Sequence, residues 1–457
     1  QKRKAMRVKW MGPWSRCLNR VGQLVPRGTF TTAAAQVAEY ASKKPTPVSI
    51  RSWLGEFAEA AQLAEFLQQE MPIRYAERIR NIEQLPQWQN FDELVTVHQT
   101  QLAAFQAFCE QRQNFDVKAF RTLVEKVQAN DKKTKFLLMQ AAQKMRSQQE
   151  VICFTDPFSV ELNKFLDDFL LSRLGCNMLL GQYLACTSNS HITSIVNPQC
   201  DAFEICQKAA EEVKRRCEVS QGRVPQVNVS AYTMTTGRHL AEAAPNQVPR
   251  FSYIPGILMH VVRELLKNSC QASLELANSE GELLEMPIDV VICADTRHVV
   301  IRITDLAGGI PRHVGSQIWS YLYSGSPTAM AGLSFGYGIG LPLSRLHAKY
   351  LGGSLDLVSL PGYGVDAYLS LPRVETDLVE NIPDEDAEGG QELEELETSH
   401  KSQENGSVSI LKLQDFSKKI WIMLLRRSVE KRKRGKCLGD IGFDLCCLKI
   451  MVDDWEP

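Results

Sequence analysis

The sequence lacks the features that would place it among membrane, disulfide-rich or nucleic-acid-binding proteins. Its 13 cysteines include no Cys-x-x-Cys pair, so the pattern indicates reduced thiols in an intracellular protein instead of a zinc site or a disulfide framework. No apolar run approaches the roughly 18 to 20 residues that a transmembrane helix needs. The 52 basic and 53 acidic side chains nearly cancel, so bulk charge favours neither nucleic acid nor a membrane as partner.

Acidic residues are missing from the beginning of the chain. No Asp or Glu precedes Glu39, whereas eight Lys and Arg occur between Lys2 and Arg27, followed by the hydroxyl-bearing stretch GTFTTAAAQ. This composition is typical of mitochondrial transit peptides. We therefore predict that residues 1–44 are a disordered transit peptide. The alternatives are a disordered basic tail and translated sequence upstream of Met6.

Strand patterns are absent from about residue 45 to residue 190, where apolar residues recur at three- and four-residue steps. This spacing predicts two helices broken near Met71-Pro72, and further helices over 91–112, 115–147 and 157–187. Long helices with short connections predict an up-down bundle. His98 is the one histidine of this region before His191 and no His-Glu box surrounds it, so we do not expect a phosphohistidine relay.

The last part of the chain is first acidic and then basic. Residues 374–407 are acidic, polar and free of aromatic side chains, and we expect them to be disordered. The segment KKIWIMLLRRSVEKRKRGK then forms a short basic amphipathic stretch with six consecutive apolar residues. It is suited to an anionic lipid surface or an acidic partner, and a solvated tail is the alternative.

The stretch HVVRELLKNSCQ (260–271) contains a polar stripe on a predicted helix. His260, Glu264 and Asn268 are four residues apart and share one face, while Val261, Val262, Leu265 and Leu266 lie on the other. A carboxylate one turn from an amide is a reasonable base beside a magnesium ligand, because Mg²⁺ takes oxygen ligands. An ordinary amphipathic helix with a polar outer face also fits this stretch when it is taken alone.

Two further motifs follow the helix in a fixed order. VVIRITDLAGG (299–309) is a β-branched strand that ends in an Asp and a glycine turn. FGYGIGLPLSRLHAKYLGG (335–353) has glycines at alternate positions before a helical pattern. Such glycines let backbone N–H groups approach phosphates, and a helix N-terminus favours anions. Together the three motifs indicate a nucleotide site.

In this order the motifs resemble the ATP-binding fold shared by gyrase, histidine kinases and mismatch-repair ATPases. They resemble more closely the mitochondrial protein kinases of 2-oxo-acid dehydrogenase complexes, that is, pyruvate dehydrogenase kinases and branched-chain 2-oxo-acid dehydrogenase kinases. The similarity covers roughly residues 45–372 and includes WSYLYSGSP (319–327). It implies an α+β protein with an all-α four-helix bundle for regulation and docking (45–190) and an α/β-sandwich ATP-binding domain of the gyrase and histidine-kinase type (191–373). A largely disordered tail (374–457) follows.

The resemblance also implies roles for individual residues. Asn268 is expected to bind Mg²⁺, and Glu264 to accept the proton of a substrate serine with His260 orienting it. Asp305 is expected to accept a hydrogen bond from the adenine amine. The remaining ATP contacts implied are Leu265, Leu266, Lys267, Gln271, Gly309, Ser324, Gly325, Gly336, Tyr337, Gly338, Ile339, Gly340 and Leu341.

Two departures from the family pattern concern ATP. Ala307 replaces a glycine in the family's D-x-G-G-G, which costs about 1 kcal/mol or more if the position requires a positive φ. Val365 replaces a threonine whose hydroxyl helps to bind adenine, a loss of about 0.5–1.5 kcal/mol. Together these changes are expected to weaken ATP by one or two orders of magnitude without removing the catalytic residues.

A third departure concerns the oxo-acid-sensing pocket of the family's bundle. Ser172 and Arg173 match its Ser-Arg pair, but Asn177 stands where the family repeats an arginine. Lys126 and Ala129 stand where it has an arginine and a histidine. Bidentate guanidinium donors cannot be replaced by lysine or asparagine, so inhibition by an oxo-acid through the usual route is in doubt.

The resemblance implies an ATP-dependent protein serine kinase of the mitochondrial matrix that uses Mg²⁺. Its substrate is expected to be the E1 component of a 2-oxo-acid dehydrogenase complex, which phosphorylation inactivates; the pyruvate complex is the first expectation and the branched-chain complex the second. The lipoyl domain of E2 and a second copy of the chain are the other implied partners, the latter from the terminal pair Asp454-Trp455. The alternative is a catalytically weak ATP-binding scaffold that docks on the lipoyl-bearing E2 core.

Overall fold

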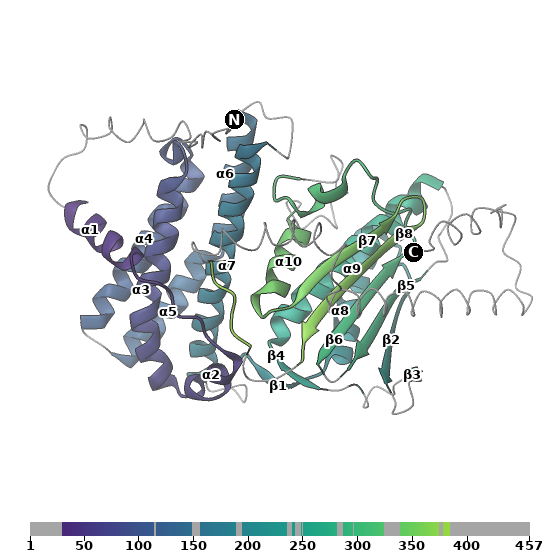
Figure 1. The fold of residues 1–457 in the computed structure, drawn as a ribbon, viewed down its shortest axis with the longest axis horizontal. Helices are drawn as coiled ribbons and strands as arrows, with labels where there is room; N and C mark the ends of the chain where they lie inside the picture. Colours follow the sequence, from purple (N-terminus) through teal and green to yellow (C-terminus); the bar gives the residue numbers. More distant parts are fainter. Residues whose placement is uncertain are drawn as a thin grey trace, which may run out of the picture. The chain divides into compact units, whose positions relative to one another are not determined.

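The computed structural model describes residues 30–113, 116–148, 156–188, 194–234, 240–242, 248, 250–280, 287–295, 297–323, 339–373 and 378–383. A helical part is followed by a part built on a mixed β-sheet (Figure 1), which confirms the predicted α+β class. In the described part of the chain, no helix is long and apolar enough to cross a membrane.

The helical part is a bundle built on four long segments. Asp116 and Asp156 cap two of its helices, since each carboxylate accepts hydrogen bonds from backbone N–H groups of the first turn. Aromatic side chains fill the space between helices; the Phe108 and Phe120 rings, for example, meet edge to face. The helices are α1 (Phe30–Ala41), α2 (Ile50–Leu54), α3 (Ala60–Gln84), α4 (Asp92–Gln113), α5 (Val117–Asp131), α6 (Thr134–Gln148) and α7 (Pro157–Cys186).

Three details of the bundle differ from the sequence prediction. The predicted break at Met71-Pro72 is wrong, because α3 runs through Pro72 and both residues are buried between neighbouring helices. The predicted helix over 115–147 is divided at Lys132-Lys133, where the end of α5 turns the Asp131 carboxylate inward to Arg173. Residues 30–41, assigned to a disordered transit peptide, form a helix whose Tyr40 ring packs edge-on against a ring of α4.

The second part contains a six-stranded sheet in the order β3-β2-β5-β6-β8-β7, in which only β2 and β5 run parallel. The β-rich sequences of residues 287–305 and 352–371 predict two hairpins, and both are confirmed: β5 pairs with β6, and β7 pairs with β8 through a turn in which Gly362 has φ 84°. A small second sheet pairs β1 (Asn197–Cys200) with β4 (Phe251–Tyr253). The strands of the larger sheet are β2 (Val227–Met234), β3 (Leu240–Glu242), β5 (Ile288–Ala294), β6 (His298–Asp305), β7 (Ser354–Leu360) and β8 (Gly364–Pro372).

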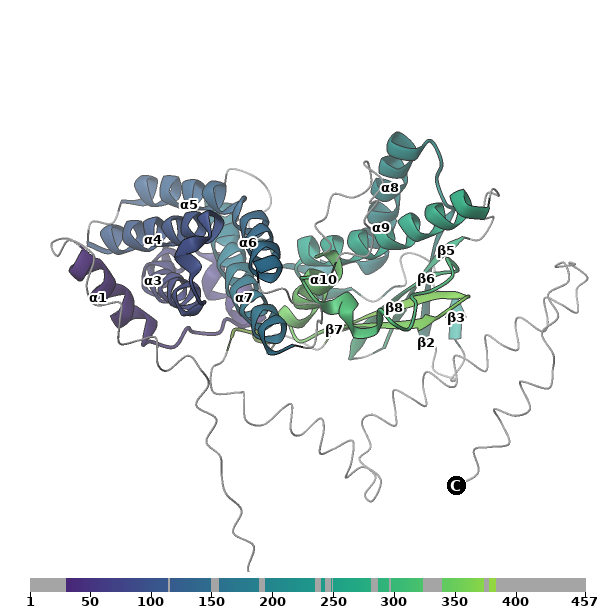
Figure 2. The ribbon, with the colours of Figure 1, turned by 90° about the horizontal axis from the view of Figure 1, so that it is seen from above.

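Three helices cover one face of this sheet: α8 (Ala202–Gln221), α9 (Pro255–Glu280) and α10 (Gly340–Tyr350), as Figure 2 shows. Side chains of β5 alternate strictly between buried and half-buried, so every second residue packs under the helices. Asp201 caps the start of α8, and Gly222 ends that helix in the left-handed conformation. This layer of helices holds α9 directly over β5 and β6.

A short segment after the sheet joins the two parts. Residues 378–383, which the sequence assigned to a disordered tail, pair with the chain entering α2. The buried Glu380 carboxylate accepts hydrogen bonds from the Arg74 guanidinium of α3 (2.5 Å) and the Tyr350 hydroxyl of α10 (2.8 Å). Gly175 of α7 faces this cluster, and an added Cβ would lie 2.7 Å from Arg74 Nη1. The rest of the predicted tail, from residue 384, lies outside the described residues.

Candidate nucleotide and phosphoryl-transfer site

Helix α9 carries the predicted polar stripe. Its apolar side is fully packed: Val261, Val262, Leu265 and Leu266 are at most 3% exposed. Leu265 and Leu266, for which the family implied ATP contacts, are therefore core residues in this structure. The opposite side of α9, with the polar stripe, faces the start of α10.

Asp305 ends β6 and is held by the helix above it. Its Oδ2 accepts a hydrogen bond from Ser269 Oγ of α9 (2.8 Å), and its Oδ1 accepts one from the Ala307 N–H (3.2 Å). Burial raises the pKa of Asp305, opposed by these hydrogen bonds and by the backbone N–H of Val365. A fixed carboxylate at the end of a strand is a suitable acceptor for an exocyclic amine.

Glycines beside Asp305 allow close backbone approach. Gly309 has φ 75°, and a Cβ there would collide with the carbonyl oxygen of Leu360. A Cβ at Gly364 of β8 would collide with the carbonyl oxygen of Asp305 itself. The family's glycine requirement is thus met at these two positions.

The concern about Ala307 is resolved by the backbone. The left-handed residues of this turn are Gly308 (φ 81°) and Gly309, whereas Ala307 does not have a positive φ. Its methyl group therefore carries no left-handed strain, and the expected cost of about 1 kcal/mol does not arise. Val365 lies opposite Asp305 in the β6–β8 register and is half-buried, so its lost hydroxyl still matters.

Glu264 lies where the phosphate loop meets α10. A Cβ at Gly340 would be 2.6 Å from Glu264 Oε2, so the carboxylate packs directly on the first residue of α10. Lys267, one turn along α9, donates a hydrogen bond to the same oxygen (2.5 Å). The structure thus gives the predicted base two neighbours: a cation and a helix N-terminus that favours anions.

His260 is not hydrogen-bonded to Glu264 within the described residues. Its ring lies against His347 of α10, with centroids 4.6 Å apart, and His260 Nε2 is buried without a partner there. Burial, with the nearby charges of Lys135 and Arg263, lowers the pKa of His260 to about 4; burial lowers that of His347 to about 3. Both rings are therefore neutral at pH 7, and the expected orienting hydrogen bond is replaced by ring packing.

His347 was missed in the sequence because it lies on another helix. Its Nδ1 is 2.7 Å from the Leu343 carbonyl oxygen one turn earlier, the geometry of an N–H donating along α10. In the sequence, the segment SRLHAKYLGG is distinguished only as the helical pattern that follows the glycine loop. The sequence offered one signal for His347: a histidine in the helix that follows the glycine loop is expected to face the polar stripe of α9.

Asn268 meets the requirements of a magnesium ligand. It is half-buried on the polar stripe, and its amide makes no hydrogen bond to any described residue. Across the same residues, His, Cys, Asp and Glu form no group of three that would hold a metal by itself. The donor set thus fits Mg²⁺ held by one amide oxygen, water and nucleotide phosphates, the usual arrangement for this ion.

Some of the remaining predicted ATP contacts lie within the described residues and others lie outside them. Ile339 is buried at the start of α10 and Leu341 lies in its first turn, whereas Gln271 is half-buried on the face of α9 that carries Glu264 and Asn268, and it donates a hydrogen bond to Glu275 (2.9 Å). The others, from the lid and the glycine loop, lie outside the described residues: Ser324, Gly325, Gly336, Tyr337 and Gly338.

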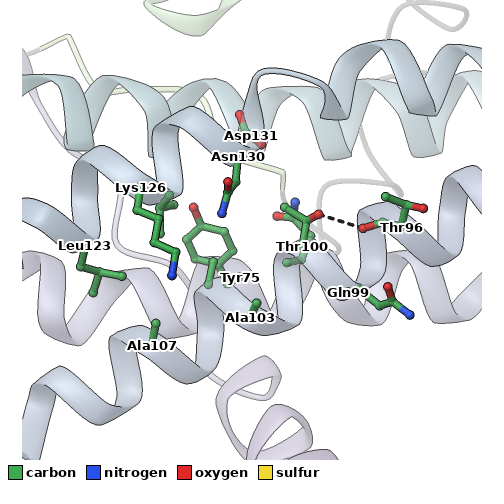
Figure 3. A pocket seen from close by; sticks show the side chains of 13 residues that line it. Tyr75, Thr96, Gln99, Thr100, Ala103, Ala107, Leu123, Lys126, Asn130 and Asp131 are labelled. Carbon is green, nitrogen blue, oxygen red and sulfur yellow. Dashed lines mark hydrogen bonds between the residues drawn. The ribbon is translucent and has the colours of Figure 1, made fainter.

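In the bundle, the predicted oxo-acid residues do not form an open pocket. Arg173 Nε lies 2.7 Å from Asp131 Oδ2, and Asn177 Nδ2 donates a hydrogen bond to the same oxygen (3.2 Å). Ser172 Oγ is buried without a partner among the described residues. A cavity of 310 Å³ does lie nearby between α3, α4 and α5, with Tyr75 and Lys126 in its lining (Figure 3), but neither Ser172 nor Arg173 lines it.

Comparison with known proteins identifies relatives of both parts of the chain. The family model described as mitochondrial branched-chain alpha-ketoacid dehydrogenase kinase matches residues 37–205, and that of histidine kinase-, DNA gyrase B- and HSP90-like ATPases matches residues 254–375. Mitochondrial pyruvate dehydrogenase (acetyl-transferring) kinase isozyme 4 of Ictidomys tridecemlineatus is 30% identical over 400 residues, which are 81% of this chain and 89% of that protein. The human isozyme 4 is 30% identical over 384 residues (80% and 88%), and isozyme 1 of Mus musculus 29% identical over 381 residues (76% and 82%).

Fold and site together define a protein kinase whose ATP-binding domain is of the histidine-kinase type. More particularly, the chain belongs to the family of mitochondrial 2-oxo-acid dehydrogenase kinases.

Proposed function

We propose that this protein phosphorylates a serine of the E1 component of a 2-oxo-acid dehydrogenase complex in the mitochondrial matrix and thereby inactivates that complex. The relatives' names favour pyruvate dehydrogenase as the substrate, with the branched-chain complex second. The observation that carries the proposal is the placement of the Glu264 carboxylate against Gly340 at the start of α10, one turn from the unengaged amide of Asn268.

Each residue then has a role defined by its surroundings. Asp305 accepts a hydrogen bond from the adenine amine, and the start of α10 supplies backbone N–H groups for the phosphates. Asn268 holds Mg²⁺, which neutralises charge on the phosphates when bound. Glu264 accepts the proton of the serine hydroxyl, while Lys267 fixes the carboxylate. Catalysis rests on positioning and electrostatics, with no covalent enzyme intermediate.

His260 acts differently from a residue that orients Glu264 by a direct hydrogen bond. Its neutral ring packs on His347, its Nε2 has no partner among the described residues, and it precedes Glu264 by one turn of α9. We propose that this nitrogen contacts the incoming serine hydroxyl and aligns it for proton transfer to Glu264.

The lipoyl domain of E2 and a second copy of the chain are proposed as further partners. They rest on the family alone, because residues Asp454 and Trp455 lie outside the described residues. The second candidate function is an ATP-binding scaffold on the E2 core, and the half-buried Val365 in the adenine pocket is the feature that favours it.

Transfer of labelled phosphate from ATP to purified E1 tests the proposal. The pyruvate and branched-chain E1 components are presented separately, each with and without Mg²⁺. Labelling of serine in one E1, with loss of that complex's activity, is expected. If calorimetry shows Mg-ATP binding but neither E1 is labelled, the ATP-binding scaffold becomes the proposed function in place of the kinase.

A further inference from the structure

An open cavity lies beside the ring pair of His260 and His347. Its volume is 710 Å³, and it is bounded by α7, by residues 194–198 and by the start of α9. The walls are mainly apolar, with Met178, Ile195, Val196, Ile254 and Ile257 among them, and His260 and His347 at one end. The cavity therefore leads from the molecular surface to the candidate catalytic histidine.

His260 at one end of the cavity has a ring nitrogen that no described residue satisfies. His260 Nε2 is buried and has no hydrogen-bond partner among the described residues. An unpaired buried polar atom costs about 1–3 kcal/mol, so a group that pairs with it on binding gains that interaction. A hydroxyl group is suited to the neutral ring, since it can donate to or accept from this nitrogen.

One cation beside this site also has no partner in the described part of the chain. Lys135, Arg173, Arg263 and Lys267 all act electrostatically on the histidine pair. Three of these side chains are neutralised, Arg173 by Asp131, Arg263 by Glu212 and Lys267 by Glu264. Lys135, in the first turn of α6, is half-buried and makes no ion pair with a described residue.

Burial and the neighbouring charge of Arg173 lower the pKa of Lys135; the Glu264 carboxylate opposes this shift but forms no ion pair with Lys135, so the positive charge is only partly compensated. Lys135 does not line the cavity, but its charge acts on both histidines at the cavity's end, so a carboxylate that enters beside them would complete this compensation. The apolar walls would meanwhile exclude water and strengthen the attraction.

We propose that this cavity is the acceptor site for the protein substrate: the serine-bearing segment enters between α7 and the start of α9, its hydroxyl meets His260 Nε2, and Lys135 selects an acidic side chain next to the serine. This inference rests on the proposed kinase function and adds the place and the chemistry of substrate recognition.

The reaction at this site is balanced without another reactant. The serine oxygen forms a bond to the γ-phosphorus of ATP, and the bond from that phosphorus to the β–γ bridging oxygen breaks. The serine proton passes to the Glu264 carboxylate, and ADP leaves with the bridging oxygen. The cavity supplies the serine hydroxyl, and the nucleotide site supplies the γ-phosphate.

Glycines in the cavity lining allow it to be filled without disturbing the core. A Cβ at Gly256 meets no atom within 4 Å, and one at Gly181 makes only ordinary contacts of 3.8 and 3.9 Å. Gly256→Trp and Gly181→Leu are the test variants. Val219→Trp is the matched control, because Val219 is 90% exposed on α8 and does not line the cavity.

Single-turnover transfer to E1 and Mg-ATP binding are measured on the same preparations. Both filling variants should bind Mg-ATP as the wild type does but should show an about tenfold or greater rise in KM for E1, the usual cost of losing a buried contact of about 1.4 kcal/mol. Val219→Trp should match the wild type in both measurements. Equal KM values in all four proteins would overturn the acceptor site while leaving the kinase function intact. A wild type that labels no E1 would instead remove the kinase function and this inference with it.

The role of Lys135 is tested with synthetic serine peptides that carry Asp or Asn beside the serine. The wild type should prefer the Asp peptides, Lys135→Arg should keep the preference, and Lys135→Gln should lose it with unchanged Mg-ATP affinity. If Lys135→Gln weakens Mg-ATP binding and leaves the preference unchanged, the lysine serves the nucleotide phosphates and the proposed selection is wrong.

Discussion

The polar stripe on α9 and the polar cluster between α5 and α7 differ in whether their groups already have partners within the chain. On α9, Asn268 and His260 Nε2 are unengaged among the described residues. In the bundle, the Asp131 carboxylate binds both Arg173 and Asn177. The stripe is therefore prepared for an external ligand, whereas a carboxylate ligand in the bundle must compete with an internal one.

The largest expected effect is at Asn268, the proposed metal ligand of the stripe. Asn268→Ala should abolish detectable Mg-ATP binding, because the described part of α9 offers no other free oxygen ligand at this position. Asn268→Asp is the control, since it retains an oxygen in the same place. Calorimetry that shows the wild-type affinity for Mg-ATP in the Ala variant would remove the metal assignment.

Glu264 separates catalysis from binding within the same stripe. Glu264→Gln should keep ATP affinity within a few-fold and lower transfer to E1 by about 10², the usual contribution of a general base. A loose transition state needs less proton removal, which limits the effect. ATP binding and single-turnover transfer are measured together, with Glu275→Gln, an exposed carboxylate three turns further along α9, as the matched control.

Two outcomes would contradict this role for Glu264. Unchanged transfer in Glu264→Gln makes it a structural residue of α9. Loss of binding together with transfer makes it part of the nucleotide site and leaves the base unidentified.

The neutral histidine pair makes stability depend on pH. The pKa of His260 is about 4 in the folded protein and about 6.5 unfolded, so the unfolded state binds more protons between these values. Above pH 6.5 this group therefore does not reduce the free energy of unfolding. As the pH falls from 6.5 towards 4, the free energy of unfolding decreases, and the decrease at pH 5 is about 2 kcal/mol.

Urea unfolding at pH 7.5 and pH 5 measures this loss. His347→Phe keeps an aromatic ring against His260 but removes one of the two titrating groups, so its free energy of unfolding should fall less between the two pH values. An equal fall in both proteins would show that other groups control the acid sensitivity.

The adenine end of the site is expected to respond more weakly. Val365→Thr should tighten ATP by up to about tenfold, because one hydrogen bond is worth about 0.5–1.5 kcal/mol. Val365→Ile, which adds volume without a hydroxyl, is the control. Equal or weaker ATP affinity in the Thr variant, measured by titration, would show that Val365 packs in a dry pocket where a hydroxyl gains nothing.

The sequence predicted what depends on local pattern. The stripe of α9 follows from four-residue spacing, and the two hairpins from alternating strands with a glycine turn, so these were located correctly. It could not predict contacts between distant residues. The pairing of His260 with His347 joins two helices, and Glu380, in a segment that resembles an acidic tail, binds Arg74 at a separation of 306 residues.

The same reasoning explains the errors in the bundle. A proline in a helical pattern predicts a break, but Pro72 and Met71 are buried between helices, and this packing keeps α3 continuous. The division between α5 and α6 depends on Asp131 turning towards Arg173 on α7. Neither effect is visible in the local sequence.

The smallest expected effect is in the bundle. Pyruvate or a branched-chain oxo-acid should change wild-type transfer to E1 by less than about twofold, because Arg173 is already paired and Asn177 is no bidentate donor. Asn177→Arg alone should add little sensitivity, because Asp131 lies within reach of both positions and would pair with the new guanidinium.

The double variant Asp131→Asn/Asn177→Arg removes the internal carboxylate and supplies the second guanidinium, and it should become sensitive to oxo-acid. Asp131→Asn alone is the control for the stability lost when Arg173 is left unpaired. Strong inhibition of the wild type would show that an oxo-acid displaces Asp131 from Arg173. The bundle cluster would then be as open to ligands as the stripe on α9, and the difference between the two regions would not hold.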